Sequence, residues 1–162
     1  MHGGHGDHGE MNAAMVRHHY QMLGVNLLVS LIIMYVAMFA MIWTWGEFVQ
    51  NLNFFYMALV MWAPMGAVML LTMRSMYPNK MLNRVLYLAL GTVFALSLYA
   101  IRDQALVGDD QFLRSMIPHH SGAVLMCREA AIHDPEIKRL CEGIVASQSS
   151  EIDQMKAIQQ RL

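Results

Sequence analysis

The residues best suited to chemistry lie in and after the motif M-I-P-H-H that begins at Met116. Thioether sulfur is a soft, neutral ligand that favours Cu(I), and imidazole binds copper in either oxidation state. At 100° per residue of a helix, Met116 and His120 share one face, with His119 and Met126 at its edge. A returning helix can bring Met155 beside them. The same residues could instead be adaptable core methionines next to solvated histidines. We favour a metal site for the group as a whole.

The two cysteines form a second candidate pair. Cys127 and Cys141 lie at nearly equal distances on either side of residues 133–134, where the chain is expected to turn, so they are predicted to be neighbours on facing helices. On an oxidising face they could form a disulfide, and in reduced form they could hold Cu(I) or Zn(II) as thiolates. Two buried free thiols are the third interpretation.

A third candidate lies at the amino terminus, MHGGHGDHGEMNAAM. His2, His5 and His8 recur at every third position among glycines, and short His-rich tracts bind metals. The segment could therefore capture a metal ion as a secondary site, or it could be a solvated tail with adventitious affinity.

The composition indicates a membrane protein. The chain has 162 residues, of which 56% are hydrophobic and only 14% charged, with a formal net charge of −1. This composition excludes a disordered chain, and a balance of 11 Lys and Arg against 12 Asp and Glu argues against a nucleic-acid partner. A membrane core needs about 20 apolar helical residues. Three runs are long enough, and they predict membrane-spanning helices at about 24–45, 54–73 and 82–101.

The chain is therefore expected to be all-α, with three parts. These are a His-rich segment (1–22), a three-helix transmembrane region (23–103) and a helical hairpin (108–162). Asp134 suits an N-cap and Pro135 a first helical position, which predicts hairpin helices of about 109–132 and 135–161. Positive residues Arg74 and Lys80 favour a cytoplasmic second loop. The amino terminus would then be cytoplasmic, and the hairpin would lie on the periplasmic or outer face of the plasma membrane.

The hairpin resembles the domain-of-unknown-function family numbered 305, over about residues 108–162. The resemblance rests on FLRSMIPHHSGAVLMCREA and on Q-x-x-E-I-x-x-M in the following helix. It implies a ferritin-like helical fold, no catalytic reaction, and copper held by Met and His. Members often carry two hairpins, whereas this chain has one, so self-association is expected. The implied ligands are Met116, His119, His120, Met126 and Met155, with Gln148 and Glu151 orienting the histidines.

The second span carries methionines at unbroken i, i+4 spacing, at Met57, Met61, Met65, Met69 and Met73. They could pass Cu(I) between sulfurs, or they could form a lipid-facing or helix-packing surface. This pattern resembles the M-x-x-x-M of eukaryotic high-affinity copper transporters, which also have three spans and a Met/His-rich amino terminus. The third span departs from those transporters because it contains Gly91 alone and no G-x-x-x-G.

The sequence therefore predicts a membrane-anchored, non-enzymatic copper-binding protein in copper trafficking, storage or tolerance. The expected cofactor is copper, as Cu(I). The expected partners are membrane lipid, further copies or subunits of a membrane complex, and a copper donor or acceptor protein. A Cu(I) transporter and an accessory subunit of a larger complex are the alternatives. Enzyme motifs such as G-x-S-x-G, H-E-x-x-H and Cys-x-x-Cys are absent from the sequence.

Overall fold

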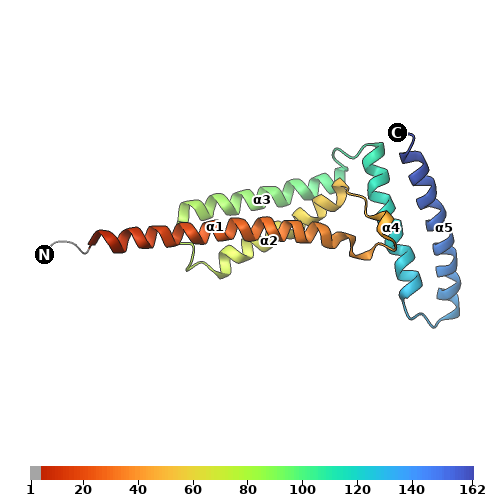
Figure 1. Ribbon diagram of the computed structural model, residues 1–162, viewed down its shortest axis with the longest axis horizontal. Coiled ribbons are helices and arrows are strands. Elements are labelled where there is room, and N and C mark those ends of the chain that lie inside the picture. Colours follow the sequence, from red (N-terminus) through yellow and green to blue (C-terminus); the bar gives the residue numbers. More distant parts are fainter. Residues whose placement is uncertain (1–4) are drawn as a thin grey trace.

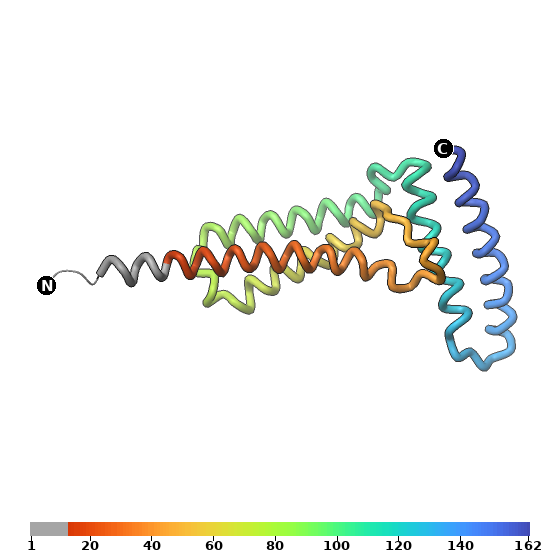
Figure 2. Tube along the Cα trace, in the orientation of Figure 1, coloured from red at the N-terminus to blue at the C-terminus, as the bar shows by residue number. Residues whose placement is uncertain are grey.

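The three apolar runs fold into three long helices that lie side by side (Figures 1 and 2). The computed structural model describes residues 5–162, and the side chains from residue 13 onward. The helices are α1 (His5–Ala37), α2 (Leu52–Thr72) and α3 (Lys80–Asp103). Each contains a stretch long and apolar enough to cross a membrane. No β-strand occurs between residues 5 and 162, so this part of the chain is all-α.

The first long helix differs from its predicted boundaries of about 24–45. α1 begins far earlier, so residues 5–22 are not a separate segment. Good helix formers such as Ala13, Ala14 and Met15, with no proline, allow this continuation. The α-helix ends at Ala37, and the chain continues as short 3₁₀ turns, η1 (Met38–Met41) and η2 (Trp45–Glu47). Residues 42–45 are not α-helical because this segment leaves the bundle and packs against a later helix.

Side chains of asparagine and aspartate cap the first turns of α2, α3 and α5. Asn51 accepts a hydrogen bond from the backbone N–H of Phe54 (2.8 Å), and Asn79 accepts one from Leu82 (3.0 Å). At the hairpin turn, Asp134 caps two backbone N–H groups and Pro135 takes the first helical position, as predicted.

The three long helices approach one another closely at Gly66 of α2. A Cβ atom there would lie 2.9 Å from Leu27 Cδ2 of α1 and 3.2 Å from Leu90 Cδ2 of α3. Glycine therefore allows both neighbours to pack on one point of α2, and Leu27 and Leu90 belong to the buried core of this bundle. One turn earlier on the same face of α2, the Trp62 indole N–H donates to the carbonyl of Leu27 (2.6 Å).

The last two helices, α4 (Asp109–Glu129) and α5 (Pro135–Gln159), form an antiparallel hairpin across one end of the bundle (Figure 1). Both are close to the predicted 109–132 and 135–161. Their shared core is small, and it consists of Leu113, Ile117, Ile152 and Met155.

The segment between α1 and α2 fixes the hairpin to the bundle, and we call the polar contacts there the junction. Glu47 is only 6% exposed. Its Oε2 accepts hydrogen bonds from Ser121 Oγ of α4 (2.6 Å) and from the backbone N–H of Thr44 (3.0 Å). Ser121 Oγ also accepts from the backbone N–H of Trp43 (2.6 Å), and Lys156 Nζ of α5 lies 3.7 Å from Glu47 Oε1.

A second set of polar contacts joins α2 to α4. The amide of Asn53 donates to Ser115 Oγ (3.2 Å), and the backbone N–H of Leu52 donates to Gln111 Oε1 (3.1 Å). The hairpin is thus docked on the bundle by buried hydrogen bonds and is not merely tethered to it.

Candidate metal centre

Two of the predicted sulfur ligands meet in the hairpin core. Met155 of α5 is buried with Leu113, Ile117 and Ile152, and Met116 of α4 is half-buried and packs against this cluster. The antiparallel pairing of α4 and α5 brings the two residues together although 39 positions separate them in the chain.

His120 lies one helical turn after Met116, and its side chain is only 12% exposed. Its Nδ1 lies 3.0 Å from Oε2 of Glu151 on α5. The contact has the distance of an ion pair but not the alignment of a hydrogen bond, so this buried nitrogen has no hydrogen-bond partner. The carboxylate is held by Ser147, whose hydroxyl donates to Glu151 Oε1 (2.8 Å).

The environment of His120 favours the neutral ring. Burial is the largest influence and lowers its pKa, the Glu151 carboxylate opposes this, and the neighbouring His119 lowers the pKa further. The net pKa lies below the ordinary value for histidine. A neutral imidazole is the form that binds a metal ion, because a protonated ring has no free lone pair.

The other predicted ligands lie farther out. His119 is exposed at the rim, with its ring centroid 6.0 Å from that of His120. Gln148 lies half-buried on α5, one turn before Glu151. Met126 is 54% exposed and follows Met116 by ten residues of one continuous helix, a rise of about 15 Å. Met126 therefore lies too far from Met116 to share one ion with it.

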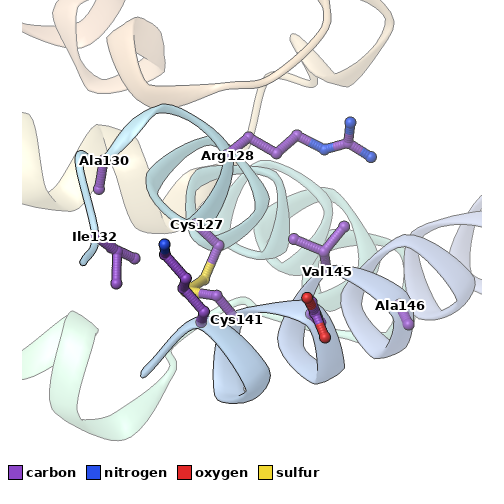
Figure 3. A pocket seen from close by; sticks show the side chains of 9 residues that line it. Cys127, Arg128, Ala130, Ile132, Cys141, Val145 and Ala146 are labelled. Carbon is purple, nitrogen blue, oxygen red and sulfur yellow. A yellow bond between two sulfur atoms is a disulfide. The ribbon is translucent and has the colours of Figure 1, made fainter. Parts of the chain in front are cut away.

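The structure contains a disulfide between the two cysteines, which is one of the three interpretations that the sequence left open. Cys127 and Cys141 form this bond between α4 and α5, with their Cα atoms 5.2 Å apart. The disulfide lies beside an open groove of about 550 Å³ near the turn of the hairpin (Figure 3). It clamps the hairpin at the end opposite to Met155.

The methionine series of α2 lies in a different environment. Met57, Met61 and Met73 are exposed on the outside of the bundle, whereas Met65 and Met69 pack against its core. In a single copy the series does not line an interior path.

The amino-terminal histidines cannot be placed in the same way. His2 lies outside the described residues, and the side chains of His5 and His8 also lie outside the described part of the chain.

The described side chains contain no group of three His, Cys, Asp or Glu residues arranged to hold a metal ion. The donors that α4 and α5 do bring together are imidazole and thioether. These are ligands for a soft, singly charged ion such as Cu(I). The buried imidazole of His120, with the Glu151 carboxylate at its Nδ1, fits such a ligand set through Nε2.

Fold and site together define an all-α protein whose helical hairpin is docked on three helices of membrane-spanning length. Residues 95–159, from the last part of α3 through α5, match the family described as a domain of unknown function (DUF305). The chain is 36% identical over 115 residues to the uncharacterized protein L153 of Acanthamoeba polyphaga mimivirus, covering 70% of this chain and 74% of that protein. The chain belongs to the DUF305 family. No solved structure matches it significantly.

Proposed function

We propose that the chain is a membrane-anchored copper-binding protein of copper trafficking, storage or tolerance. In this proposal Met116, His120 and Met155 of the hairpin hold Cu(I), and His119 completes the site from its rim. The observation that carries the proposal is the buried imidazole of His120, which lies one turn from Met116 and has the Glu151 carboxylate 3.0 Å from its Nδ1, so that Nε2 is the nitrogen that would bind the ion.

The charge around this group suits a singly charged ion. Thioether and neutral imidazole carry no charge, so a bound Cu(I) would keep its positive charge in a half-buried place. The Glu151 carboxylate, 3.0 Å from the ring of His120, compensates that charge without being a ligand itself. Carboxylates in this position also orient the imidazole.

The surroundings of the hairpin support a location on the outer face of the plasma membrane. The segment 38–51 and the hairpin lie at one end of the bundle (Figure 1). Arg74 and Lys80 lie in the loop between α2 and α3, and cationic loops favour the cytoplasm. The amino terminus would then be cytoplasmic.

A ferritin-like arrangement would need a second hairpin. Large apolar side chains remain exposed on the hairpin, including Phe112, Ile137 and Leu140. A second copy, or another subunit of a membrane complex, would cover them.

The direct test is the affinity for Cu(I), measured by competition with a chromophoric Cu(I) chelator. The protein would be in detergent, with ascorbate keeping the copper reduced. We expect the variant Met116→Leu/His120→Ala to lose at least about 100-fold in affinity, since even outer partners of metal ligands contribute 10–100-fold. Met126→Leu is the matched control, on the same helix but about 15 Å away. It should change the affinity less than about threefold, and equal losses in the two variants would contradict the proposal.

The hairpin variant and a second variant on α2 distinguish the two alternative functions. An accessory subunit would show unchanged copper content in Met116→Leu/His120→Ala but weaker co-purification with its partners. A transporter would carry Cu(I) into proteoliposomes and lose this flux in Met61→Leu/Met65→Leu. Flux that does not depend on these two methionines would reject the transport path along α2.

A further inference from the structure

At the end of the bundle farthest from the hairpin, an open groove of about 540 Å³ lies between α1 and the loop that joins α2 to α3. Its lining includes Met15 and His19 of α1 and Met76 of the loop. We propose that this groove is a second soft-metal site, which binds Cu(I) or Ag(I) through the two thioethers and the imidazole. The inference does not depend on copper binding by the hairpin.

The orientation of His19 is that of a metal ligand. Its Nδ1 lies 3.2 Å from the backbone carbonyl oxygen of Met76. A carbonyl can only accept a hydrogen bond, so Nδ1 carries the proton in this contact, and the lone pair of the neutral ring is on Nε2. Histidines that bind metals usually donate their other ring N–H to a carbonyl or carboxylate in this way.

The helix places a sulfur donor beside this imidazole. Met15 precedes His19 by four residues, and positions i and i+4 are neighbours on one face of a helix. Met15 is exposed, so its side chain is free to move toward an ion. Met76 contributes its carbonyl to His19 and lines the opposite wall of the groove, where its partly buried side chain also packs against the bundle core. The groove is thus lined by three residues with soft or borderline donors, from two elements.

The two walls of the groove are held in a fixed relation before an ion arrives. The hydroxyl of Tyr20, next to His19, donates to Asn83 Oδ1 of α3 (2.8 Å) and accepts from the backbone N–H of Asn79 (3.2 Å). Tyr77, next to Met76, is buried in the bundle core with its ring 5.2 Å from that of Tyr20. Such preorganisation reduces the ordering cost of binding.

The position of the groove adds a functional consequence. The segments that line it, the start of α1 and the loop between α2 and α3, lie at the opposite end of the three long helices from the hairpin (Figure 2). If those helices span a membrane, the protein has soft-metal donors on both faces of it. On the face away from the hairpin, the donors then include Met15, His19 and Met76 in addition to the His-rich tract.

The test uses the full chain in nanodiscs with ¹³C-labelled methionine methyl groups, titrated with Ag(I). Ag(I) has the same preference for thioether ligands as Cu(I) and does not undergo redox chemistry under these conditions. We expect the methyl resonances of Met15 and Met76 to shift together, with one transition. Met81, which is 72% exposed at the same end of the bundle but is not in the groove, should not shift with them.

Two variants decide whether the shifts report one site. His19→Gln keeps an amide donor for the Met76 carbonyl but removes the imidazole, and it should raise the Ag(I) concentration for half-transition at least tenfold. Met15→Leu leaves the contact between His19 and Met76 intact and should produce a similar loss at Met76. Independent shifts of the two methyls, equal shifts at Met81, or unchanged transitions in either variant would overturn the proposal. In the Met116→Leu/His120→Ala background the Met15 and Met76 shifts should persist, which separates this site from the one in the hairpin.

Discussion

The hairpin and α2 are both rich in methionine, but they surround their sulfurs differently. In the hairpin, Met116 and Met155 come from facing helices and share one cluster, with His120 a turn away. On α2, Met57 and Met61 follow each other at regular spacing, yet both are exposed on the outside of the bundle. The comparison teaches that regular spacing on one helix does not by itself gather sulfurs, whereas a facing helix brings a second methionine into the same cluster in the hairpin.

The two regions also differ in how firmly they are held. Buried hydrogen bonds at Glu47 and Ser121 dock the hairpin, and a disulfide closes its far end. The outward methionines of α2 have no such framework around them. The comparison therefore predicts that changes to the hairpin framework alter copper affinity or stability, whereas changes to the α2 series do not.

The largest expected effect comes from opening the disulfide. Cys127 and Cys141 are 14 residues apart, and closing a loop of this size contributes about 3 kcal/mol of stability. Cys127→Ser/Cys141→Ser should therefore speed amide hydrogen exchange in α4 and α5, corresponding to a loss of about 3 kcal/mol. Exchange in α2 serves as the internal control and should not change. Equal exchange in the two forms of the hairpin would show that the clamp does not stabilise it.

The next effect concerns the buried carboxylate of Glu47. Glu47→Gln should lower the stability at pH 7 by about 1.5–3 kcal/mol, the usual value of a hydrogen bond to a charged group. Thermal unfolding in detergent would measure it, with Glu129→Gln as an exposed control on α4.

The same substitution should alter the pH dependence. Burial alone raises the pKa of Glu47, but hydrogen bonds from Ser121 and Thr44 and the charge of Lys156 outweigh it, so the net pKa lies below 4.5. The ionised carboxylate therefore adds stability above about pH 4.5, and this stability is lost as the pH falls through the lowered pKa. Glu47→Gln should remove this acid-dependent loss. An identical acid profile in the two proteins would contradict the assignment.

A smaller effect is expected from Glu151, the carboxylate beside the proposed copper site. Glu151→Gln keeps the size of the side chain but removes its charge 3.0 Å from His120. Copper affinity should fall 10–100-fold, as for other residues that orient a metal-bound histidine. Glu142→Gln, exposed on the same helix, is the control and should leave the affinity unchanged. Equal affinities for all three proteins would mean that Glu151 does not support the site.

The smallest effect is expected on α2. Met57→Leu/Met61→Leu replaces two exposed side chains by others of similar volume, so stability should change by less than about 0.5 kcal/mol. The Cu(I) affinity of the tightest site should also be unchanged. A loss comparable to that in the hairpin variants would break the contrast between the two regions.

Much of the fold could be predicted because it depends on local signals. Three uncharged runs predicted three long helices, and Asp134 with Pro135 predicted where α5 begins. The proximity of Cys127 and Cys141 could be predicted, because antiparallel helices joined by a short turn bring matching positions together. The sequence alone did not decide between a disulfide, metal-binding thiolates and free thiols.

The junction could not be predicted, because it depends on contacts between distant parts of the chain. Nothing local marks Glu47 as buried or Ser121 as its partner, and the two lie 74 residues apart. The end of α1 at Ala37 has the same cause, since the apolar run continues to Gly46 while docking turns the chain away.

The distance between two of the predicted ligands could not be read from their helical phase. Angular position alone placed Met126 with Met116, whereas the rise along α4 separates them by about 15 Å. Glu151 was expected beside the histidines, and its carboxylate lies 3.0 Å from His120 Nδ1. The sequence could not predict that this contact lacks hydrogen-bond geometry, because that depends on how the two side chains are aligned. The groove at Met15, His19 and Met76 could not be predicted, because His19 and Met76 are 57 residues apart in the sequence.

The central claim is that one soft ion is held between α4 and α5 by sulfur and imidazole nitrogen. X-ray absorption at the copper K edge tests it most directly. The measurement uses Met15→Leu/His19→Gln protein and its further variants, loaded with one equivalent of Cu(I), so that the groove beside α1 does not supply ligands. The account predicts a first shell containing both sulfur and imidazole nitrogen, with the sulfur contribution reduced in Met116→Leu/Met155→Leu and retained in Met57→Leu/Met61→Leu. A shell of nitrogen and oxygen only, or a sulfur contribution that survives loss of Met116 and Met155, would contradict it.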